Sequence, residues 1–169
     1  MVNIEQILRE SRDLAASRHF PPFVGPERES TPLNATPYIA HISEAGEDGF
    51  LSNRAAFIEE LRVGLDRLRQ LNALPVAALL GGSAIGAKAN PSDLDCVVFY
   101  QQEATAELRS GALLGLQREL KRSRLDVRFV PLDGDPLILL KTISFFSMLY
   151  SKNAGSPEIV RGLVLLDCR

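Results

Sequence analysis

Two aspartates separated by one residue stand at the start of an apolar run. Asp93 and Asp95 flank Leu94, and the segment continues as Cys96–Tyr100. On a β-strand the side chains at positions i and i+2 project from the same face, so the two carboxylates are expected side by side. Two like charges this close repel each other unless a proton or a cation lies between them. The pair is therefore typical of a divalent metal site, and Mg²⁺ prefers such oxygen ligands; the alternative is a solvated strand end.

A glycine pair lies shortly before these aspartates. Gly81 and Gly82 end the apolar run Val76–Leu80 and are followed by Ser83. A strand that ends in two glycines permits a tight turn with the backbone close to a ligand. We expect Ser83 to cap a short helix over Ala84–Ala87, whose free N–H groups would form an anion pocket. A triphosphate would then lie between this pocket and the aspartates.

A third carboxylate lies in a later segment, 125–131, whose alternation of apolar and polar residues predicts a strand. Asp126 belongs either to the same site or to the surface of that strand. Arg128 shares its face and either binds a phosphate or pairs with one of the aspartates. In the polar loop, Lys88 is either a surface residue or a contact of the triphosphate. Ser92 either caps the turn before the aspartate pair or contacts the nucleotide.

The elements that must position these residues follow from apolar spacing and from glycine and proline positions. We predict helices over 2–17, from Ser52 or Asn53 (either one the N-cap) to about 71, over 104–122 and over 136–150, and strands over 76–80, 93–100, 125–131 and 161–167. This alternation indicates an α/β (α+β) fold with a mixed sheet. The helix over 136–150 is apolar nearly all round, which predicts a buried core helix or an oligomer contact.

The N-terminal part differs in composition. Residues 20–49 contain five prolines, too many for a helix, and the stretch is too long for a simple turn. It is expected to wrap over the domain surface or to form a lid or partner-binding arm. We therefore divide the chain into an N-terminal helix with a Pro-rich arm, 1–49, and a single domain, 50–169.

Taken together, Leu80-Gly81-Gly82-Ser83, nine residues, Asp93-Leu94-Asp95 and the later Asp126 resemble the signature of the nucleotidyltransferase superfamily, which includes DNA polymerase beta. The resemblance implies a nucleotidyltransferase-like mixed β-sheet flanked by helices. It also implies transfer of a nucleoside monophosphate from an NTP to a hydroxyl acceptor (a small molecule, a protein or an RNA end) with release of pyrophosphate.

The resemblance also implies roles for single residues. Asp93 and Asp95 would bind two Mg²⁺ ions, or Mn²⁺ in their place, while Asp126 would bind the catalytic ion and activate the acceptor hydroxyl. Nucleotide-binding candidates are Gly81, Gly82, Ser83, Lys88, Ser92 and Arg128. The flanking segments are similar to a group of short bacterial nucleotidyltransferase-fold proteins.

One departure from the superfamily pattern leaves a second function open. Most active members add a helical domain after the third strand, and the chain beyond residue 131 is too short to hold one. Base recognition would then come from the N-terminal part, a protein partner or a second subunit. The alternative function is a non-catalytic binding or regulatory module, such as an antitoxin-type partner protein.

Composition limits the classes of ligand and the cellular compartment that we expect for this protein. The net charge of −2 gives no basic excess, so a long nucleic acid is not favoured as a ligand. No run of 18 apolar residues exists, which argues against a membrane span. The distant Cys96 and Cys168 fit reduced cysteines of a cytoplasmic protein, and neither they nor His19 and His41 have zinc-ligand spacing.

Overall fold

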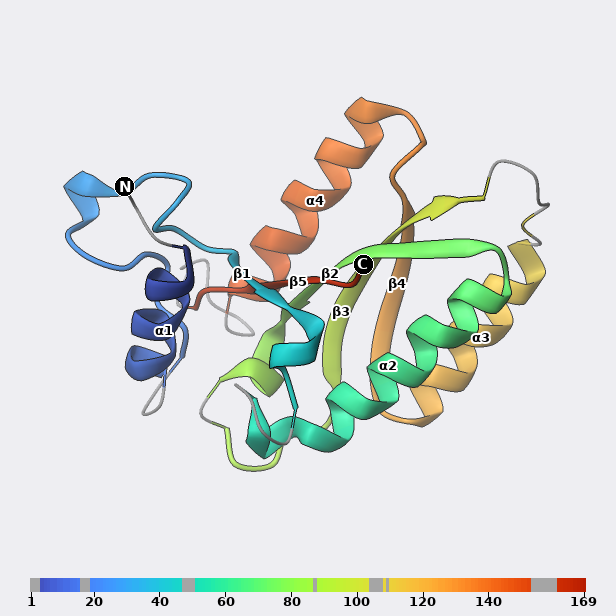
Figure 1. Cartoon of the computed structure of the whole chain (residues 1–169), viewed down its shortest axis with the longest axis horizontal. Helices are drawn as coiled ribbons and strands as arrows, with labels where there is room; N and C mark the ends of the chain where they lie inside the picture. The colour runs from blue at the N-terminus through green and yellow to red at the C-terminus, as the bar shows by residue number, and fades with distance from the viewer. Residues whose placement is uncertain are drawn as a thin grey trace.

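One open mixed sheet of five strands organises the computed structural model (Figure 1). The structure describes residues 4–15, 19–46, 51–86, 88–103, 108, 110–152 and 161–169. The strands are β1 (Tyr38–His41), β2 (Ala73–Gly81), β3 (Leu94–Gln102), β4 (Leu125–Pro131) and β5 (Val164–Asp167), in the sheet order β1-β5-β2-β3-β4. The pairs β1/β5 and β3/β4 are parallel, and the other two pairs are antiparallel. The predicted α/β class with a mixed sheet is confirmed.

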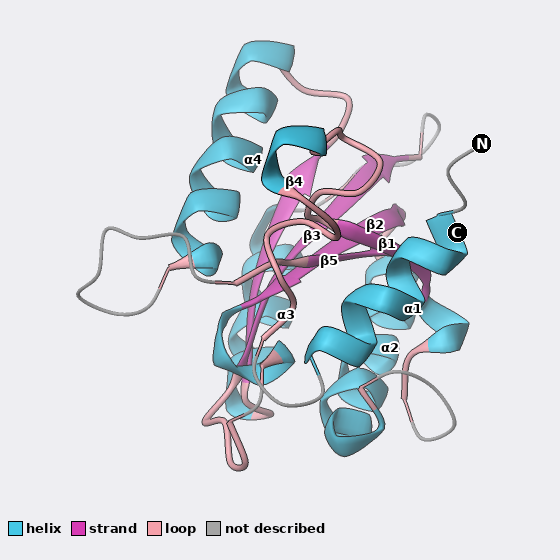
Figure 2. Ribbon diagram, turned by 90° about the vertical axis from the view of Figure 1, so that its left-hand side faces the viewer, coloured by secondary structure: helices cyan, strands magenta, loops and turns pink. Residues whose placement is uncertain are grey.

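Helices cover both faces of this sheet. In the described residues they are α1 (Ile4–Ala15), α2 (Ala55–Gln70), α3 (Ser110–Arg122) and α4 (Pro136–Ser151). Helices α2 and α3 lie on one face, and α4 lies on the other (Figures 1 and 2). Because strand side chains alternate, Val98 packs into the larger core with α2 and α3, whereas Val97 packs into a smaller core with Tyr150 of α4. The central strands are thus buried on both faces, as predicted.

The Pro-rich stretch contributes a strand that the sequence did not predict. Strand β1 pairs in parallel with β5 at the edge of the sheet, with Tyr38 opposite Val164. Phe20, Val24 and Tyr38 are buried in the larger core. A strand of four residues directly after Pro37 gives little alternation to detect, and proline is tolerated next to an edge strand. The boundary at residue 49 stays a prediction.

Several predicted boundaries need correction. The N-cap of α2 is Arg54 and makes no side-chain cap bond; Ser52 and Asn53 instead lie in a preceding 3₁₀ turn, Ser52–Arg54. Strand β2 begins at Ala73 and includes Pro75, beside an irregularity in its pairing with β3. Helix α3 begins at Ser110, while 104–107 and 109 lie outside the described residues.

Helix α4 is not a buried core helix. Tyr150 and Ser151 are its buried residues. Large apolar side chains along its length are exposed by 47–74%: Leu137, Ile138, Leu140, Phe145, Met148 and Leu149. An all-apolar pattern has no polar face to orient the helix, so composition alone did not reveal the exposed side. Among the described helices, none is both long enough and apolar enough to cross a bilayer.

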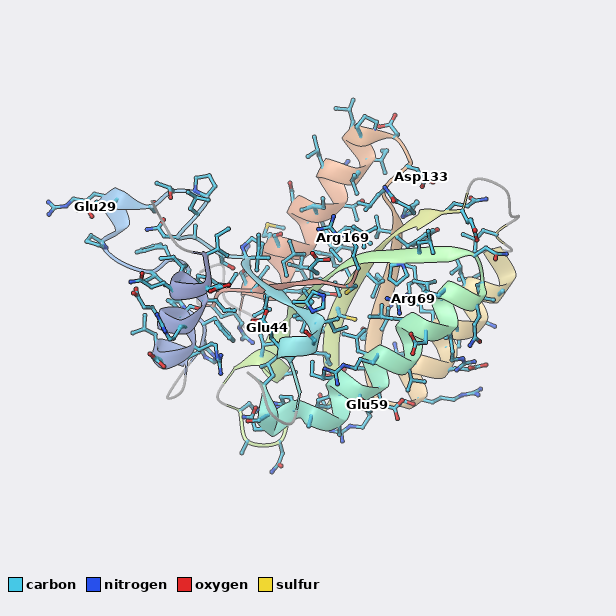
Figure 3. The ribbon with its side chains drawn as sticks, viewed as in Figure 1. Glu29, Glu44, Glu59, Arg69, Asp133 and Arg169 are labelled. Atoms are coloured by element: carbon cyan, nitrogen blue, oxygen red, sulfur yellow. The ribbon has the colours of Figure 1, made fainter. Side chains whose placement is uncertain are left out.

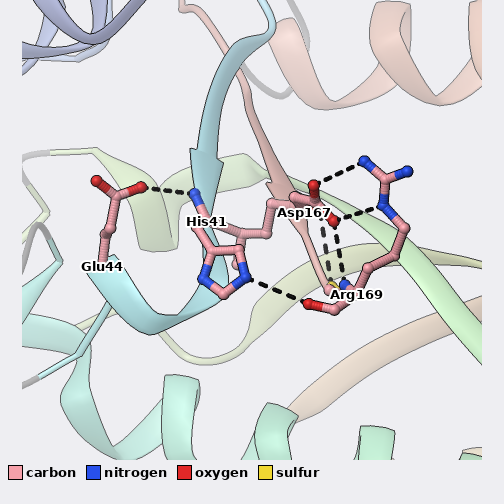
Figure 4. A network of polar contacts seen from close by, with 6 residues as sticks. His41, Glu44, Asp167 and Arg169 are labelled. Carbon is pink, nitrogen blue, oxygen red and sulfur yellow. Dashed lines mark hydrogen bonds and ion pairs between the residues drawn. The ribbon is translucent and has the colours of Figure 1, made fainter.

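The charged side chains labelled in Figure 3 lie at the surface of the molecule. Glu59 and Arg69 lie on the exposed face of α2 (Figure 3), in agreement with the predicted polar face. At the β1/β5 edge, Arg169 pairs with Asp167 at 2.8 Å, and its backbone carbonyl lies 3.2 Å from Nε2 of His41 (Figure 4). Asp167 is opposite Ala77 of β2 in the sheet register, four residues before Gly81. This polar network therefore lies away from the strand end that carries the glycine pair.

Candidate functional site

The sheet register brings the glycine bend and two of the carboxylates into one row. Asp95 of β3 is opposite Gly81 of β2 on one side and opposite Asp126 of β4 on the other. Register partners in neighbouring strands project from the same face, so Asp95 and Asp126 lie together. Val97, two residues after Asp95, packs under α4, which places both carboxylates on the α4 face. Asp93 precedes the first residue of β3.

The two glycines serve different contacts. A Cβ at Gly81 would lie 2.3 Å from the Cβ of Tyr150, so the absent side chain makes room for the C-terminal end of α4. Gly82 has φ of +68°, and a Cβ there would lie 2.0 Å from Oδ2 of Asp95. The expected tight turn with a closely approaching backbone is therefore present. The group that the backbone of this turn approaches is the carboxylate of Asp95.

The negative charges in this row act on one another. Burial, followed by repulsion from Asp93 and then from Asp126, raises the pKa of Asp95 to about 6. The positive charges of Arg161 and Arg128 act in the opposite direction on the same pKa and only partly offset the rise. Three carboxylates and two guanidinium groups therefore act on one another around Asp95, and burial contributes most to its raised pKa.

Two of the carboxylates already have polar partners. Arg128 Nη1 donates to Oδ1 of Asp126 at 2.7 Å, which realises the ion-pair alternative for this arginine. Ser92 Oγ donates to Oδ1 of Asp93, also at 2.7 Å. Within the described residues, no group of three or more histidine, cysteine, aspartate or glutamate side chains is arranged to hold a metal ion. Each of these two bonds engages one carboxylate oxygen, Oδ1, of its aspartate.

The expected anion pocket differs from the prediction. A four-residue 3₁₀ turn, Gly82–Ile85, replaces the helix expected over 84–87, and residue 87 lies outside the described residues. Gly81 is the N-cap in place of Ser83, and the cap has no side-chain hydrogen bond. Ser83 is half-buried inside the turn, while Lys88 is exposed in the loop that follows. Contact of either residue with a nucleotide stays a prediction.

Arg54 organises this loop, and sequence reasoning missed it. Its side chain is only 7% exposed. The guanidinium donates to five backbone carbonyls. The bond to the carbonyl of Ala84 is 2.8 Å long, and the other acceptors are the carbonyls of Asn53, Gly86, Lys88 and Ala89. An arginine at the start of an amphipathic helix is typical of a solvated polar face, so no local signal marked it.

Arg161 and His19 also lie near the site and were not predicted as site residues. Arg161 is 7% exposed and directly precedes the buried Gly162–Leu163 segment. A Cβ on Gly86, at the end of the glycine turn, would lie 2.5 Å from Nδ1 of His19. A charged residue next to an apolar strand is a weak sequence signal, because such residues usually mark a solvated strand end.

Comparisons with known proteins place the chain in a family without an assigned activity. No curated protein and no solved structure matches it. The model of the family of unknown function DUF6932 matches residues 26–167, which include every strand of the sheet and all the carboxylates of the candidate site. The chain belongs to the family DUF6932.

Proposed function

We propose that this protein is a nucleotidyltransferase-fold enzyme that transfers a nucleoside monophosphate from an NTP to a hydroxyl acceptor and releases pyrophosphate. The observation that carries the proposal is the register that sets Asp95 between Gly81 and Asp126. Two carboxylates on neighbouring strands beside a glycine turn match the arrangement that the sequence signature predicts. The acceptor class stays open between a small molecule, a protein and an RNA end.

The donor set fits Mg²⁺, with Mn²⁺ as its substitute. Carboxylate oxygens are the ligands these hard cations take, and Asp93, Asp95 and Asp126 supply them. The pKa of Asp95 is raised first by burial and then by repulsion from Asp93 and Asp126, and a bound cation would relieve that repulsion. When bound, two such ions stabilise charge on the attacking and leaving oxygens of the transferred phosphoryl group. Asp93 and Asp95 would hold both ions, and Asp126 would hold one of them.

Side chains and backbone groups of this chain would assist the chemical steps of the transfer. The acceptor oxygen attacks the α-phosphorus, the bond to the bridging oxygen breaks, and pyrophosphate leaves with the electron pair. The carboxylate of Asp126 accepts the hydroxyl proton, and its ion pair with Arg128 orients it in the resting site. The Gly82–Ile85 turn would present backbone N–H groups to the phosphates, with Ser83 as the side-chain contact.

Labelled nucleotides test this proposal. The full-length protein is incubated with each α-labelled NTP and Mg²⁺, and both label transfer and pyrophosphate release are measured. An Asp93→Asn/Asp95→Asn double variant should lose the activity, whereas Asp13→Asn, an exposed aspartate of α1, should retain it. Absence of Mg²⁺-dependent NTP binding, or equal turnover by the double variant, would contradict the proposal.

The alternative is a binding module that keeps this fold without turnover. The observation that favours it is the exposed apolar side of α4, on which Leu137 is 74% exposed and Ile138 63% exposed. Exposed apolar patches of this kind mark protein–protein contacts. Titration calorimetry separates the two functions, because an inactive module should show no Mg²⁺-dependent affinity for any NTP.

A further inference from the structure

A buried arginine lies on the opposite side of the glycine turn from Asp126. The backbone N–H of Arg161 donates to the carbonyl of Ser151 at 3.3 Å. The preceding residue, Tyr150, packs directly on Gly81. Arg161 is therefore fixed beside the end of α4 that covers the first glycine of the motif.

The segment at Phe20 and Pro21 packs against Gly162, the residue that follows Arg161. The N–H of Gly162 donates to the carbonyl of Phe20 at 2.6 Å, and a Cβ on Gly162 would lie 2.3 Å from the carbonyl oxygen of Pro21. This close approach brings His19 next to Arg161, and His19 in turn contacts Gly86. Arg161 and His19 thus flank the glycine turn, Gly81–Gly86, at its two ends.

The electrostatics agree with this placement. Arg161 and Asp95 each affect the other's pKa, so the guanidinium lies within electrostatic reach of the carboxylate row. Burial and the charge of Arg161 lower the pKa of His19, which keeps the imidazole neutral at pH 7. Its Nδ1 is buried and has no hydrogen-bond partner among the described residues. Arg161 therefore supplies the positive charge on this side, and His19 supplies unused hydrogen-bonding capacity.

We propose that Arg161, with His19 beside it, forms an anion subsite that binds the polyphosphate end of the nucleotide. The subsite rests on the proposed nucleotidyltransferase function for the identity of its natural ligand. A metal–polyphosphate complex carries cations at one end and excess negative charge at the other. Carboxylates from β3 and β4 lie on one side of the turn and the guanidinium of Arg161 on the other, so the two ends of such a complex would each meet charges of the opposite sign. Arginine suits this role because its planar fork matches phosphate oxygens bidentately.

Inorganic tripolyphosphate tests the subsite without a nucleoside. Titration calorimetry on the full-length protein measures binding of tripolyphosphate with Mg²⁺ and of Mg²⁺ alone. Arg161→Gln should weaken tripolyphosphate binding by about 10- to 100-fold, the loss expected for charged hydrogen bonds. It should not weaken the binding of Mg²⁺ alone, because the carboxylates that would hold the ion are unchanged. Arg161→Lys keeps the charge without the fork and should restore part of the affinity. Arg169→Gln, an exposed arginine at the far edge, is the matched control.

The outcomes separate the subsite from the proposed function. Equal tripolyphosphate binding by wild type and by a folded Arg161→Gln variant overturns the subsite and leaves the nucleotidyltransferase proposal standing. Arg161-dependent tripolyphosphate binding without Mg²⁺-dependent NTP binding supports the subsite and overturns the proposed function. Failure of the wild type to bind tripolyphosphate overturns the subsite. Because Arg161→Gln removes a buried charge, thermal unfolding confirms its fold, and His19→Gln gives a second variant expected to lose several-fold in affinity.

Discussion

The Cα of Gly82 lies so close to Asp95 that a Cβ at this position would be 2.0 Å from the carboxylate oxygen Oδ2. The same glycine has φ of +68°, a left-handed conformation that other residues adopt only at a cost. The packing of the protein itself therefore explains why a glycine occupies position 82. This glycine lets the turn close over the central carboxylate.

Substitution of Gly82 by alanine should destabilise the protein and displace Asp95. The left-handed backbone costs roughly 1–2 kcal/mol for a residue with a Cβ, and the contact with Asp95 adds to it. Urea unfolding should show a loss of at least about 2 kcal/mol, and Mg²⁺ binding should weaken. Gly115→Ala is the control, because the space beside this α3 glycine is open and the helix should gain about 0.5–1 kcal/mol. A neutral Gly82→Ala variant would contradict the crowding at the turn.

Asp95 should make the metal-free protein less stable as the pH rises. Its pKa in the fold is about 6, against 3.8 as the ordinary value, so the folded state retains its proton where the unfolded chain loses it. The stability contributed by the protonated form is complete below pH 3.8 and is lost as the pH rises through 6. In EDTA, Asp95→Asn should remove this slope and stabilise the protein above pH 7 by roughly 2 kcal/mol, after a discount for the partial exposure of the group.

Denaturant unfolding at pH 4.5 and pH 7.5 measures this effect. Asp13→Asn is the control, since this α1 aspartate is exposed. If Asp95→Asn lowers stability at pH 7.5 as much as at pH 4.5, Asp95 does not retain its proton in the fold. Added Mg²⁺ should stabilise the wild type and leave Asp95→Asn unchanged, which links the pH effect to the proposed cation site.

The strands around the site could be predicted because local patterns define them. Apolar runs that stop at Gly81 and continue after Asp95 set the central strands. Asp93 lies one residue before β3, so the face that it was expected to share with Asp95 stays a prediction. The sheet order could not be predicted, because the neighbours of Asp95 are fixed by pairings between distant segments. In the 3₁₀ turn at Ser83, Arg54 binds the carbonyl of Ala84, a contact across 30 positions that no local pattern records.

Local sequence patterns could not predict the edge strand β1 or the exposed side of helix α4. Four residues after Pro37 are too few to show alternation, and their partner β5 lies at the other end of the chain. Along α4 nearly every position is apolar, so the buried Tyr150 could not be distinguished from the exposed Leu137. The surroundings of Arg161 form only when the segment at Phe20 packs against Gly162, which is distant in the sequence.

Arg54 should be required for the loop that connects the glycine turn with the aspartates. Arg54→Met fills similar space but leaves the carbonyls of Ala84 and its neighbours without their donor, at a cost of roughly 3 kcal/mol. Arg54→Lys should recover part of this loss, because an ammonium group reaches fewer carbonyls. Arg67→Met removes an exposed pair with Glu119 and should cost less than about 1 kcal/mol. Equal losses for Arg54→Met and Arg67→Met in thermal or urea unfolding would contradict this role.

Arg128 should compete with cations for Asp126. The two side chains are paired at 2.7 Å through Oδ1 of Asp126, so the guanidinium occupies one of the two oxygens that a cation would use, and its charge repels the cation. Arg128→Gln should therefore raise the affinity for Mg²⁺ alone, by about 1.5- to 5-fold, the gain expected from losing one partly exposed ion pair. Calorimetry with Mg²⁺ measures the change, and Arg169→Gln, which breaks the exposed pair with Asp167, should have no effect. A fall in Mg²⁺ affinity would show that Arg128 holds Asp126 in the orientation that binds the ion.

The outer side of α4 should tolerate polar residues without loss of stability. Leu137 and Leu140 are 74% and 61% exposed, so glutamine at both positions should change the free energy of unfolding by less than about 0.5 kcal/mol each. Leu163 is 1% exposed and packs in the core beneath the same helix, so Leu163→Ala should cost about 2–5 kcal/mol. Urea unfolding compares the variants, and sedimentation velocity at the same concentrations records their association state. A loss of 2 kcal/mol or more from the glutamine substitutions would mean that this side is covered in solution. Concentration-dependent sedimentation of the wild type, abolished in the double variant, would then identify a second copy of the chain as the cover.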